Sequence, residues 1–367
     1  MYRILTVLTV CICPILTFAS RAGATDLDSA RARWESGATP VVPEMIYLEW
    51  ERTFLPELTA GEIAQRKRAI ADNPEHPDHT MLRDAERRIG SGGDNELFKA
   101  WHFDARSWRI NIDTPYSPSS THDDYTRNRS TAWSYARDGA VTVVDVESAP
   151  AERNPTLAYP SLLNATKLLL YGGWGYGPSG TTPTDFQSDN SEWRMTAQTT
   201  DGSWRYRVQG TFASVASELL ITEIELVASP SAPLIGTTIR FENHLFNDHL
   251  DRIIPQTAVT ISPSGRETQR LTLIQLADAD RSQREAILTV PSVGVSDATR
   301  GDLPVRVVMD FRPGRSQITN FSEDGTVTQS EGIATSSTST KSFRGIGWIV
   351  AAGLIVTLIV LRVRSGG

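Results

Sequence analysis

The chain has almost no cysteine. Its only two cysteines, Cys11 and Cys13, lie in an N-terminal apolar segment, so the rest of the 367 residues contains no thiol. This excludes a disulfide framework, a thiol nucleophile and a thiolate metal site. A secreted eukaryotic domain of this size usually carries disulfides, so their absence favours a bacterial envelope protein that folds by core burial alone.

Motifs for catalysis and phosphate or calcium binding are also missing. Ser179 stands in a Gly-Pro-Ser-Gly segment that lacks the Gly-x-Ser-x-Gly pattern of a nucleophile elbow. Asp278 and Asp280 resemble the start of a calcium loop, but Thr289 stands where that loop needs a glutamate. The glycine-rich stretch 172–190 has no Gly-Lys-[Ser/Thr] for a phosphate.

Two polar clusters contain histidine. Pro77 separates His76 from His79 and interrupts the helical spacing that a metal site would use. His244 and His249 flank a segment that we interpret as a turn between strands. We therefore predict solvated loops at both places, with no metal, no cofactor and no assigned catalytic residue.

The charge of the chain is acidic. The formal net charge is −7, and six of the 36 basic residues lie in or beside the two terminal hydrophobic segments described next, where no acid lies. The part between those segments is therefore more acidic than the whole chain, which excludes nucleic acid and anionic lipid surfaces as general partners. No feature of the sequence sets an oligomeric state.

Long hydrophobic runs occur only at the two ends. Residues 1–24 have the basic start, apolar centre and Ala-Gly-Ala end of a cleaved secretory signal, with an uncleaved anchor as the alternative. Residues 345–361 contain no charge, and arginines follow them directly, as expected of a transmembrane helix. Between them we predict an exported domain at 25–331 and a Ser/Thr-rich stalk at 332–344.

This arrangement predicts a location and an orientation. The signal exports the domain, so residues 362–367 form a short cytoplasmic tail. We predict a single-pass protein of the bacterial inner membrane, whose N-terminal domain lies in the periplasm. The membrane, through the C-terminal helix, is its first predicted partner.

The exported part has the pattern of an antiparallel β protein. Asp-Gly turns between alternating apolar and polar residues predict three hairpins, around Gly139, Gly202 and Gly325. We predict further strands at 46–54, 97–103, 108–113, 219–227, 237–243, 257–261, 271–276 and 305–311. Helices are predicted at 59–72, at 80–90 and, as the most apolar segment of the exported part, at 160–170. The stretch 172–190 is predicted to be a loop or linker, with a possible division of the domain there.

Large aromatic side chains gather on one side of the predicted hairpins. They form either a filled core or the lining of an apolar cavity beneath the helix at 162–170. In the second interpretation the candidate ligand-binding residues are Trp133, Tyr135, Trp193, Trp204, Tyr206, Leu163 and Leu170.

This order of elements resembles the LolA, LolB and RseB-like periplasmic proteins. The likeness covers about 46–311 and rests on two capped helices beside a first strand, long hairpins with inward aromatics, and an apolar helix in mid-chain. It implies a mainly β fold, a large antiparallel curved sheet or half-barrel with about three helices packed on it, to which this chain adds one transmembrane helix. The resemblance also implies a lipid or a lipoprotein acyl chain as ligand. No ligand-binding residue of the family can be matched to this sequence.

Three functions remain open on the sequence. The first is a membrane-anchored envelope protein that binds a lipid, an acyl chain or another apolar ligand. The second is a non-enzymatic structural or partner-binding domain, in which the aromatics are fully packed. The third is an envelope hydrolase, whose carboxylates sequence spacing alone does not reveal.

Overall fold

A computed structural model describes the central part of the chain. The described residues are 27–73, 78–91, 94–114, 122–136, 138–150, 154–189, 191–213, 218–291, 305–322 and 325–332. Within these ranges, no helix combines the length and apolar character needed to cross a membrane. The predicted signal at 1–24, transmembrane helix at 345–361 and tail at 362–367 lie outside the described residues.

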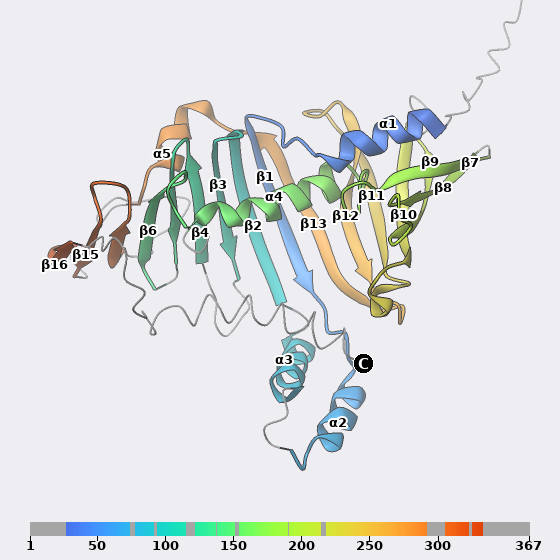
Figure 1. Ribbon diagram of the computed structural model, residues 1–367, viewed down its shortest axis with the longest axis horizontal. Coiled ribbons are helices and arrows are strands. Elements are labelled where there is room, and N and C mark those ends of the chain that lie inside the picture. Colours follow the sequence, from blue (N-terminus) through green and yellow to red (C-terminus); the bar gives the residue numbers. More distant parts are fainter. Residues whose placement is uncertain are drawn as a thin grey trace, which may run out of the picture.

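One open sheet of 16 strands dominates the molecule (Figure 1). From edge to edge the strands run in the order β16-β15-β14-β6-β5-β4-β3-β2-β1-β13-β12-β11-β10-β9-β8-β7. The first half contains β1 (Ile46–Phe54), β2 (Asp94–Asp104), β3 (Ser107–Asp113), β4 (His122–Asn128), β5 (Thr131–Tyr135) and β6 (Ala140–Asp145). The second half contains β7 (Thr182–Ser188), β8 (Glu192–Gln198), β9 (Arg205–Phe212), β10 (Leu219–Ala228), β11 (Thr238–Asn247), β12 (Arg252–Ile261) and β13 (Glu267–Asp278). The edge beyond β6 is made by β14 (Val307–Asp310), β15 (Gln317–Phe321) and β16 (Val327–Gly332).

The sheet consists of two antiparallel meanders joined at its centre. β1–β6 and β7–β13 each pair in sequence order, and β13 pairs with β1 to unite them. The predicted hairpins are present, because Gly139, Gly202 and Gly325 adopt the positive φ angles that tight turns need. The mainly β fold and the curved open sheet are therefore confirmed. A purely antiparallel sheet is wrong, since β14 pairs with β6 in parallel.

α1 (Leu27–Ala38) and the unit that contains α4 (Tyr159–Ala165) lie across one face of this sheet (Figure 1). α4 continues from η2 (Pro155–Ala158) into η3 (Thr166–Leu170), a π-helical turn, and this unit runs across the strands (Figure 1). η2 contacts β4 and β5, and η3 contacts β12. α1 packs beside β7. The remaining elements are α2 (Ala60–Ala69), α3 (Asp78–Ser91), η4 (Ala232–Leu234), η5 (Arg281–Gln283) and α5 (Arg284–Leu288).

The three predicted helices are present as α2, α3 and the α4–η3 unit. The prediction of about three helices is too low, because α1 and α5 were not expected. Both are weakly apolar in sequence, and α1 buries only Ala30, Trp34 and Gly37. The stretch 172–190 is not wholly a loop, since it contains β7.

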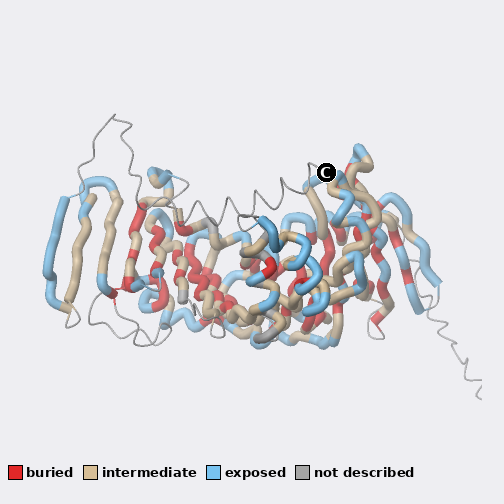
Figure 2. Tube along the Cα trace, turned by 90° about the horizontal axis from the view of Figure 1, so that it is seen from below, coloured by how far each residue is buried: buried red, intermediate tan, exposed pale blue. Residues whose placement is uncertain are grey.

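The main core lies between the sheet and the α1 and α4 helices. Trp193 is stacked between Phe186 and Trp174, with ring centroids 5.8 and 5.6 Å away, and Trp34 meets Trp174 edge-on at 6.4 Å. Apolar side chains from β1 to β12 continue this cluster along the sheet. Figure 2 shows the buried residues concentrated in the central strands, while β15 and β16 are mostly intermediate or exposed.

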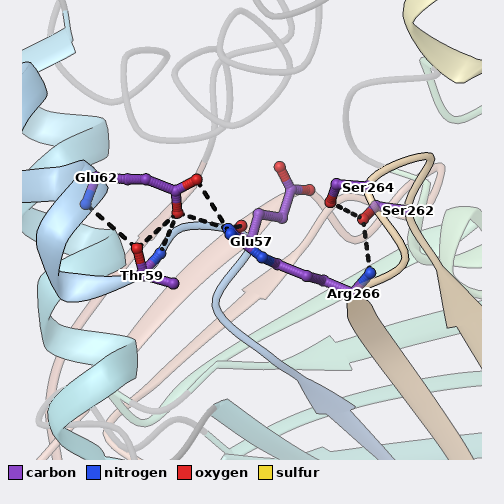
Figure 3. Close-up of polar contacts among 6 residues, drawn as sticks. All are labelled: Glu57, Thr59, Glu62, Ser262, Ser264 and Arg266. Carbon is purple, nitrogen blue, oxygen red and sulfur yellow. Dashed lines mark hydrogen bonds and ion pairs between the residues drawn. The ribbon is translucent and has the colours of Figure 1, made fainter.

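The α2–α3 hairpin connects β1 to β2, projects beyond the ends of these central strands, and is held there by polar contacts (Figures 1 and 3). Thr59 caps α2 through a capping box with Glu62. Arg266, in the turn between β12 and β13, donates to both carboxylate oxygens of Glu62, at 2.6 and 3.1 Å, and to the Glu57 carbonyl at 2.9 Å. This ion pair, together with the hydrogen bonds from Thr59, lowers the pKa of Glu62 to about 2.

Candidate functional site

The sheet opens between β10 and β11. Both strands are ten residues long, but their pairing covers only 223–225 on β10 and 238–240 on β11. Beyond that point β10 continues to pair with β9, and β11 with β12. Asn243 has a left-handed φ of 57° just where the two strands part. A gap therefore forms between two segments that are each held in place by their outer neighbours.

A cleft of about 140 Å³ occupies this gap. Its apolar walls come from β10 and β12, and its roof comes from the end of η3 and the loop that follows. The lining residues are Arg33, Ser36, Leu170, Tyr171, Gly172, Trp174, Glu218, Leu219, Leu220, Ile221, His244, Arg252, Ile253 and Pro255.

Glycines allow the roof to approach the sheet and α1 closely. A Cβ at Gly173, whose φ is +80°, would come within 2.3 Å of the Phe241 ring. A Cβ at Gly175, whose φ is +70°, would come within 2.0 Å of the Ala38 nitrogen. Tyr171 also fixes the loop, because its hydroxyl donates to the Val41 carbonyl at 3.1 Å. The roof therefore packs closely against the sheet and α1, so this part of the stretch 172–190 is not a linker.

Arg252 is the unusual charge of the cleft. Its guanidinium carbon lies 4.7 Å from the centre of the Tyr171 ring, and its Nε is buried without a hydrogen-bond partner among the described residues. Burial lowers the pKa of this guanidinium, although an arginine stays charged at any physiological pH. A partly buried charge with an unbonded donor is unfavourable, and the attraction of Glu218 offsets this only in part, so this position favours an anion.

The other charged groups of the cleft are engaged with one another or with the backbone. Arg33 pairs with Glu218 and lies over the Trp174 ring. The Nε2 atom of His244 is 3.1 Å from the Ile221 carbonyl, so the imidazole bridges the gap between the strands. Burial lowers the pKa of His244, which keeps the ring neutral near pH 7.

An exposed apolar side chain lies next to the cleft. Phe246 is 59% exposed and stands directly across from Ile253, which lines the wall. It is also two residues from His244, on the same side of β11. The cleft thus joins a partly buried cation to an apolar surface.

The sequence-predicted site residues fall into three groups. Leu170 lines the cleft. Trp193 and Tyr206 lie in the main core, and Leu163 and Trp204 are partly buried against it. Trp133 and Tyr135 belong to a different cluster, with Val141, Val143 and Val305.

Trp133 and Tyr135 face away from the α4 helix. Alternation along β5 puts them on the side opposite Ala132, and the Trp133 indole donates to the Leu288 carbonyl of α5 at 3.1 Å. The structure therefore does not bring these two residues together with Trp193 and Tyr206 beneath the apolar helix. A single pocket lined by both hairpins, as the sequence suggested, is wrong.

Sequence reasoning missed Arg252, Arg33 and the role of His244. The sequence predicts a solvated turn at 244–251, with a metal site as the alternative, and gives no sign that His244 lines a cleft. In the described residues, no three or more His, Cys, Asp or Glu side chains gather as a metal site would need. The one available signal was Arg252 itself, a cation directly before the apolar run Ile253-Ile254-Pro255.

Comparisons with known proteins find likeness only at the level of structure. No family model and no curated protein matches the chain. A LolA superfamily protein from Nitrosomonas europaea aligns with a TM-score of 0.35 and 11% identity, over 72% of this chain and 98% of that one. An outer membrane lipoprotein-sorting protein domain from Vibrio parahaemolyticus aligns at 0.35 and 10%, over 71% and 97%. A DUF1329 family protein from Desulfovibrio piger aligns at 0.36 and 10%, over 72% and 97%.

These values describe a similar layout and no more. A LolA superfamily protein is among these structures. TM-scores below 0.5 at such low identity do not show that this chain belongs to any of the three families.

Proposed function

We propose that this protein is an envelope protein whose β domain binds an amphiphile, an apolar chain with an anionic head group. The cleft between β10 and β11 is the proposed binding site. The observation that carries the proposal is Arg252, a partly buried guanidinium with an unpartnered Nε at an apolar cleft.

The head group is proposed to lie against Arg252. A carboxylate or phosphate there would lie next to the Arg252 guanidinium and offset the burial of its positive charge. Glu218 forms its ion pair with Arg33 and attracts Arg252 only from a longer distance, so Arg252 is the cation that can take a ligand. Glu218 also limits the net positive charge of the cleft, which suits a head group of a single negative charge.

The apolar chain is proposed to leave the cleft along Phe246. A volume of about 140 Å³ holds a head group and a few carbon atoms, but not a whole acyl chain. Ile253, Pro255 and the exposed Phe246 ring continue the apolar surface outward. Burying that surface would contribute roughly 25 cal/mol for each Å² removed from water.

Binding of lauric acid, compared with dodecanol, tests this function. We expect laurate to bind more tightly, because only laurate has a charge for Arg252. Arg252→Met keeps much of the side-chain bulk and removes the charge, so it should weaken laurate about tenfold or more while leaving dodecanol unchanged. Arg194→Met, at an exposed position on β8, is the matched control and should change neither ligand.

Equal binding of laurate and dodecanol to the wild type and to Arg252→Met would contradict the proposal. It would leave the second candidate, a structural or partner-binding domain. That candidate is favoured by the main core itself, in which Trp193 is only 2% exposed and stacked on both faces.

The cellular setting is proposed from the sequence. The signal at 1–24, the exported domain at 25–331, the stalk at 332–344, the transmembrane helix at 345–361 and the cytoplasmic tail at 362–367 would hold the domain at the periplasmic side of the bacterial inner membrane. An anchored domain of this kind would act as a sensor or acceptor for its ligand and not as a carrier across the periplasm.

A further inference from the structure

The end of the sheet formed by β3–β6 carries a group of arginines. Two cavities, of about 510 and 470 Å³, lie there and share Arg129, Ser130 and Arg284 in their linings. They therefore form one continuous groove. Its basic residues, which we call the arginine groove, are Arg106, Arg127, Arg129, Arg284 and Arg312.

Adjacent turns bring these arginines together. Arg106 lies in the turn between β2 and β3, and Arg129 lies in the turn between β4 and β5, with a φ of 57°. The Arg129 amide donates to the Arg106 carbonyl at 2.7 Å, which ties the two turns to each other. The Arg127 Nε donates to the Arg129 carbonyl at 3.2 Å. The two turns are thus held side by side, and the Arg127 guanidinium is bonded to one of them.

Few of these charges are neutralised by acids. Arg312 pairs with Asp310, and Arg284 pairs with Asp104 at 3.1 Å. Within the described part of the chain, Arg106, Arg127 and Arg129 have no ion pair. Like charges held close together repel one another, so a cluster of this kind is unfavourable for the protein alone. It is notable in a chain whose net charge is −7.

Arg284 has an unused donor in the same groove. One of its terminal nitrogens donates to Asp104 and, at 2.8 Å, to the Ser107 hydroxyl, but its Nε is buried without a partner among the described residues. Buried donors are normally hydrogen-bonded, so the unpaired Nε leaves the burial of the Arg284 charge incompletely compensated, and an anion in the groove would offset it.

We propose that the arginine groove binds a ligand that carries two phosphate groups or more. Guanidinium groups bind phosphate through paired N–H donors, and a volume of this size suits a small-molecule ligand. Arg106 and Arg127 line one cavity, Arg312 lines the other, and Arg129 and Arg284 line both, so several guanidiniums can face one ligand. Three acids, Asp104, Glu147 and Glu285, also line the groove, so its five arginines are in excess.

Calorimetric titration of the purified protein with inorganic pyrophosphate tests the proposal. Pyrophosphate should bind at low salt and weaken as sodium chloride is added, because salt screens the exposed arginines. Arg129→Gln and Arg106→Gln should each weaken binding about tenfold, the usual effect of removing one charge-assisted hydrogen bond. Both are exposed turn residues, and unchanged melting of either variant will show that its fold is intact.

Arg205→Gln is the matched control. Arg205 is an exposed arginine on β9, in the other half of the sheet, and it lines neither cavity of the groove. The variant removes one positive charge from the protein without touching the groove. Its affinity for pyrophosphate should equal that of the wild type.

A second titration, with lipid vesicles, distinguishes a soluble phosphate ligand from lipid head groups. Vesicles of phosphatidylglycerol present single phosphates in a surface, whereas pyrophosphate is soluble. Binding of pyrophosphate that depends on Arg129 assigns a soluble ligand, and binding of vesicles alone that depends on Arg129 assigns lipid head groups. The proposal would be overturned if neither pyrophosphate nor the vesicles bound, or if Arg205→Gln lost as much affinity as Arg129→Gln. Citrate that binds as tightly as pyrophosphate would overturn it as well.

Discussion

Arg109 forms a buried ion pair within the sheet and contacts α5. It is fully buried on β3, between the rings of Trp101 and Trp133, and it donates to both oxygens of Asp124 on β4 at 3.1 and 2.9 Å. Its Nη1 also donates to the Ile287 carbonyl of α5 at 3.3 Å. The pair therefore fastens α5 to the sheet. Its energetic value depends on both charges being present.

Removing one member of this pair should be costly. Asp124→Asn keeps the shape of the side chain but leaves the Arg109 charge uncompensated, so the free energy of unfolding should fall by about 3–5 kcal/mol. Denaturant unfolding measures this change. Glu225→Gln breaks the pair with Arg207, which is 61% exposed, and should cost at most about 1 kcal/mol. Similar losses in both variants would contradict the assigned role of Asp124.

Two tryptophans of the predicted site differ in burial: Trp193 lies inside the main core, and Trp204 lies at its margin. Trp193 is stacked on both faces, so Trp193→Ala should cost about 3–5 kcal/mol in unfolding free energy. Trp204 is only partly buried and stacks on Tyr206 alone, at 6.4 Å, so Trp204→Ala should cost markedly less. Thermal and urea melts of the two variants compare them. The reverse order would mean that the core beneath α4 is not filled as described.

At the scale of elements, strands with an alternating apolar face were predictable and polar ones were not. β8 and β9 alternate clearly around Asp201-Gly202, and the structure pairs them as expected. β4 was missed because Asp124 and Thr126 occupy its buried side, where a polar network replaces apolar packing. β7 was missed because it is a mostly exposed edge strand. An alternating sequence pattern reveals a strand that buries an apolar face, and neither β4 nor β7 relies on such burial.

The docking of α4 onto β2 should depend on pH. The Nδ1 atom of His102 donates to the Pro43 carbonyl at 2.8 Å, and Nε2 accepts from the Tyr159 hydroxyl at 3.2 Å, so the ring is neutral. Burial lowers the pKa of His102, although the nearby Asp104 and Glu44 act in the opposite direction. The unfolded chain then binds a proton that the folded chain does not. Stability is therefore complete above about pH 6.5 and falls as the pH drops from there toward the folded pKa.

Unfolding measured from pH 7.5 to 5 checks this behaviour, in a range above the titration of most carboxylates. His102→Gln removes the titrating group, so its stability should vary less with pH over the same range. The remaining dependence should come from His244, whose pKa is also lowered by burial. An unchanged slope in His102→Gln would show that this ring does not set the pH dependence.

The α2–α3 hairpin should loosen without loss of the sheet. Arg266→Gln removes the bidentate ion pair with Glu62 and the bond to the Glu57 carbonyl. We expect faster proteolysis and faster amide exchange in α2, with little change in the melting of the sheet, since the contact involves only the turn at the ends of β12 and β13. Arg240→Gln, which breaks an exposed pair with Glu223 on the sheet, is the control and should leave α2 unaffected.

At the scale of the whole molecule, pairings between distant segments could not be predicted. The sequence indicates that β1 and β13 are strands, but their union, across more than 200 residues, depends on tertiary packing. The same holds for the parallel pairing of β14 with β6. The candidate cleft exists only because β10 and β11 part after three paired residues, a register feature that alternation along one strand does not encode.

The apolar runs at the two ends of the chain are separate in sequence from the folded domain. In the sequence, long apolar runs lie only before residue 25 and after residue 344, and the described strands and helices fall between 27 and 332. A fragment of residues 25–332 should therefore be soluble, with the circular dichroism of a β protein and a cooperative melt. The chain extended to residue 367 should instead follow the membrane fraction, because it adds the apolar run at 345–361. Recovery of the shorter fragment only with detergent, or of the longer one without it, would refute the predicted anchor.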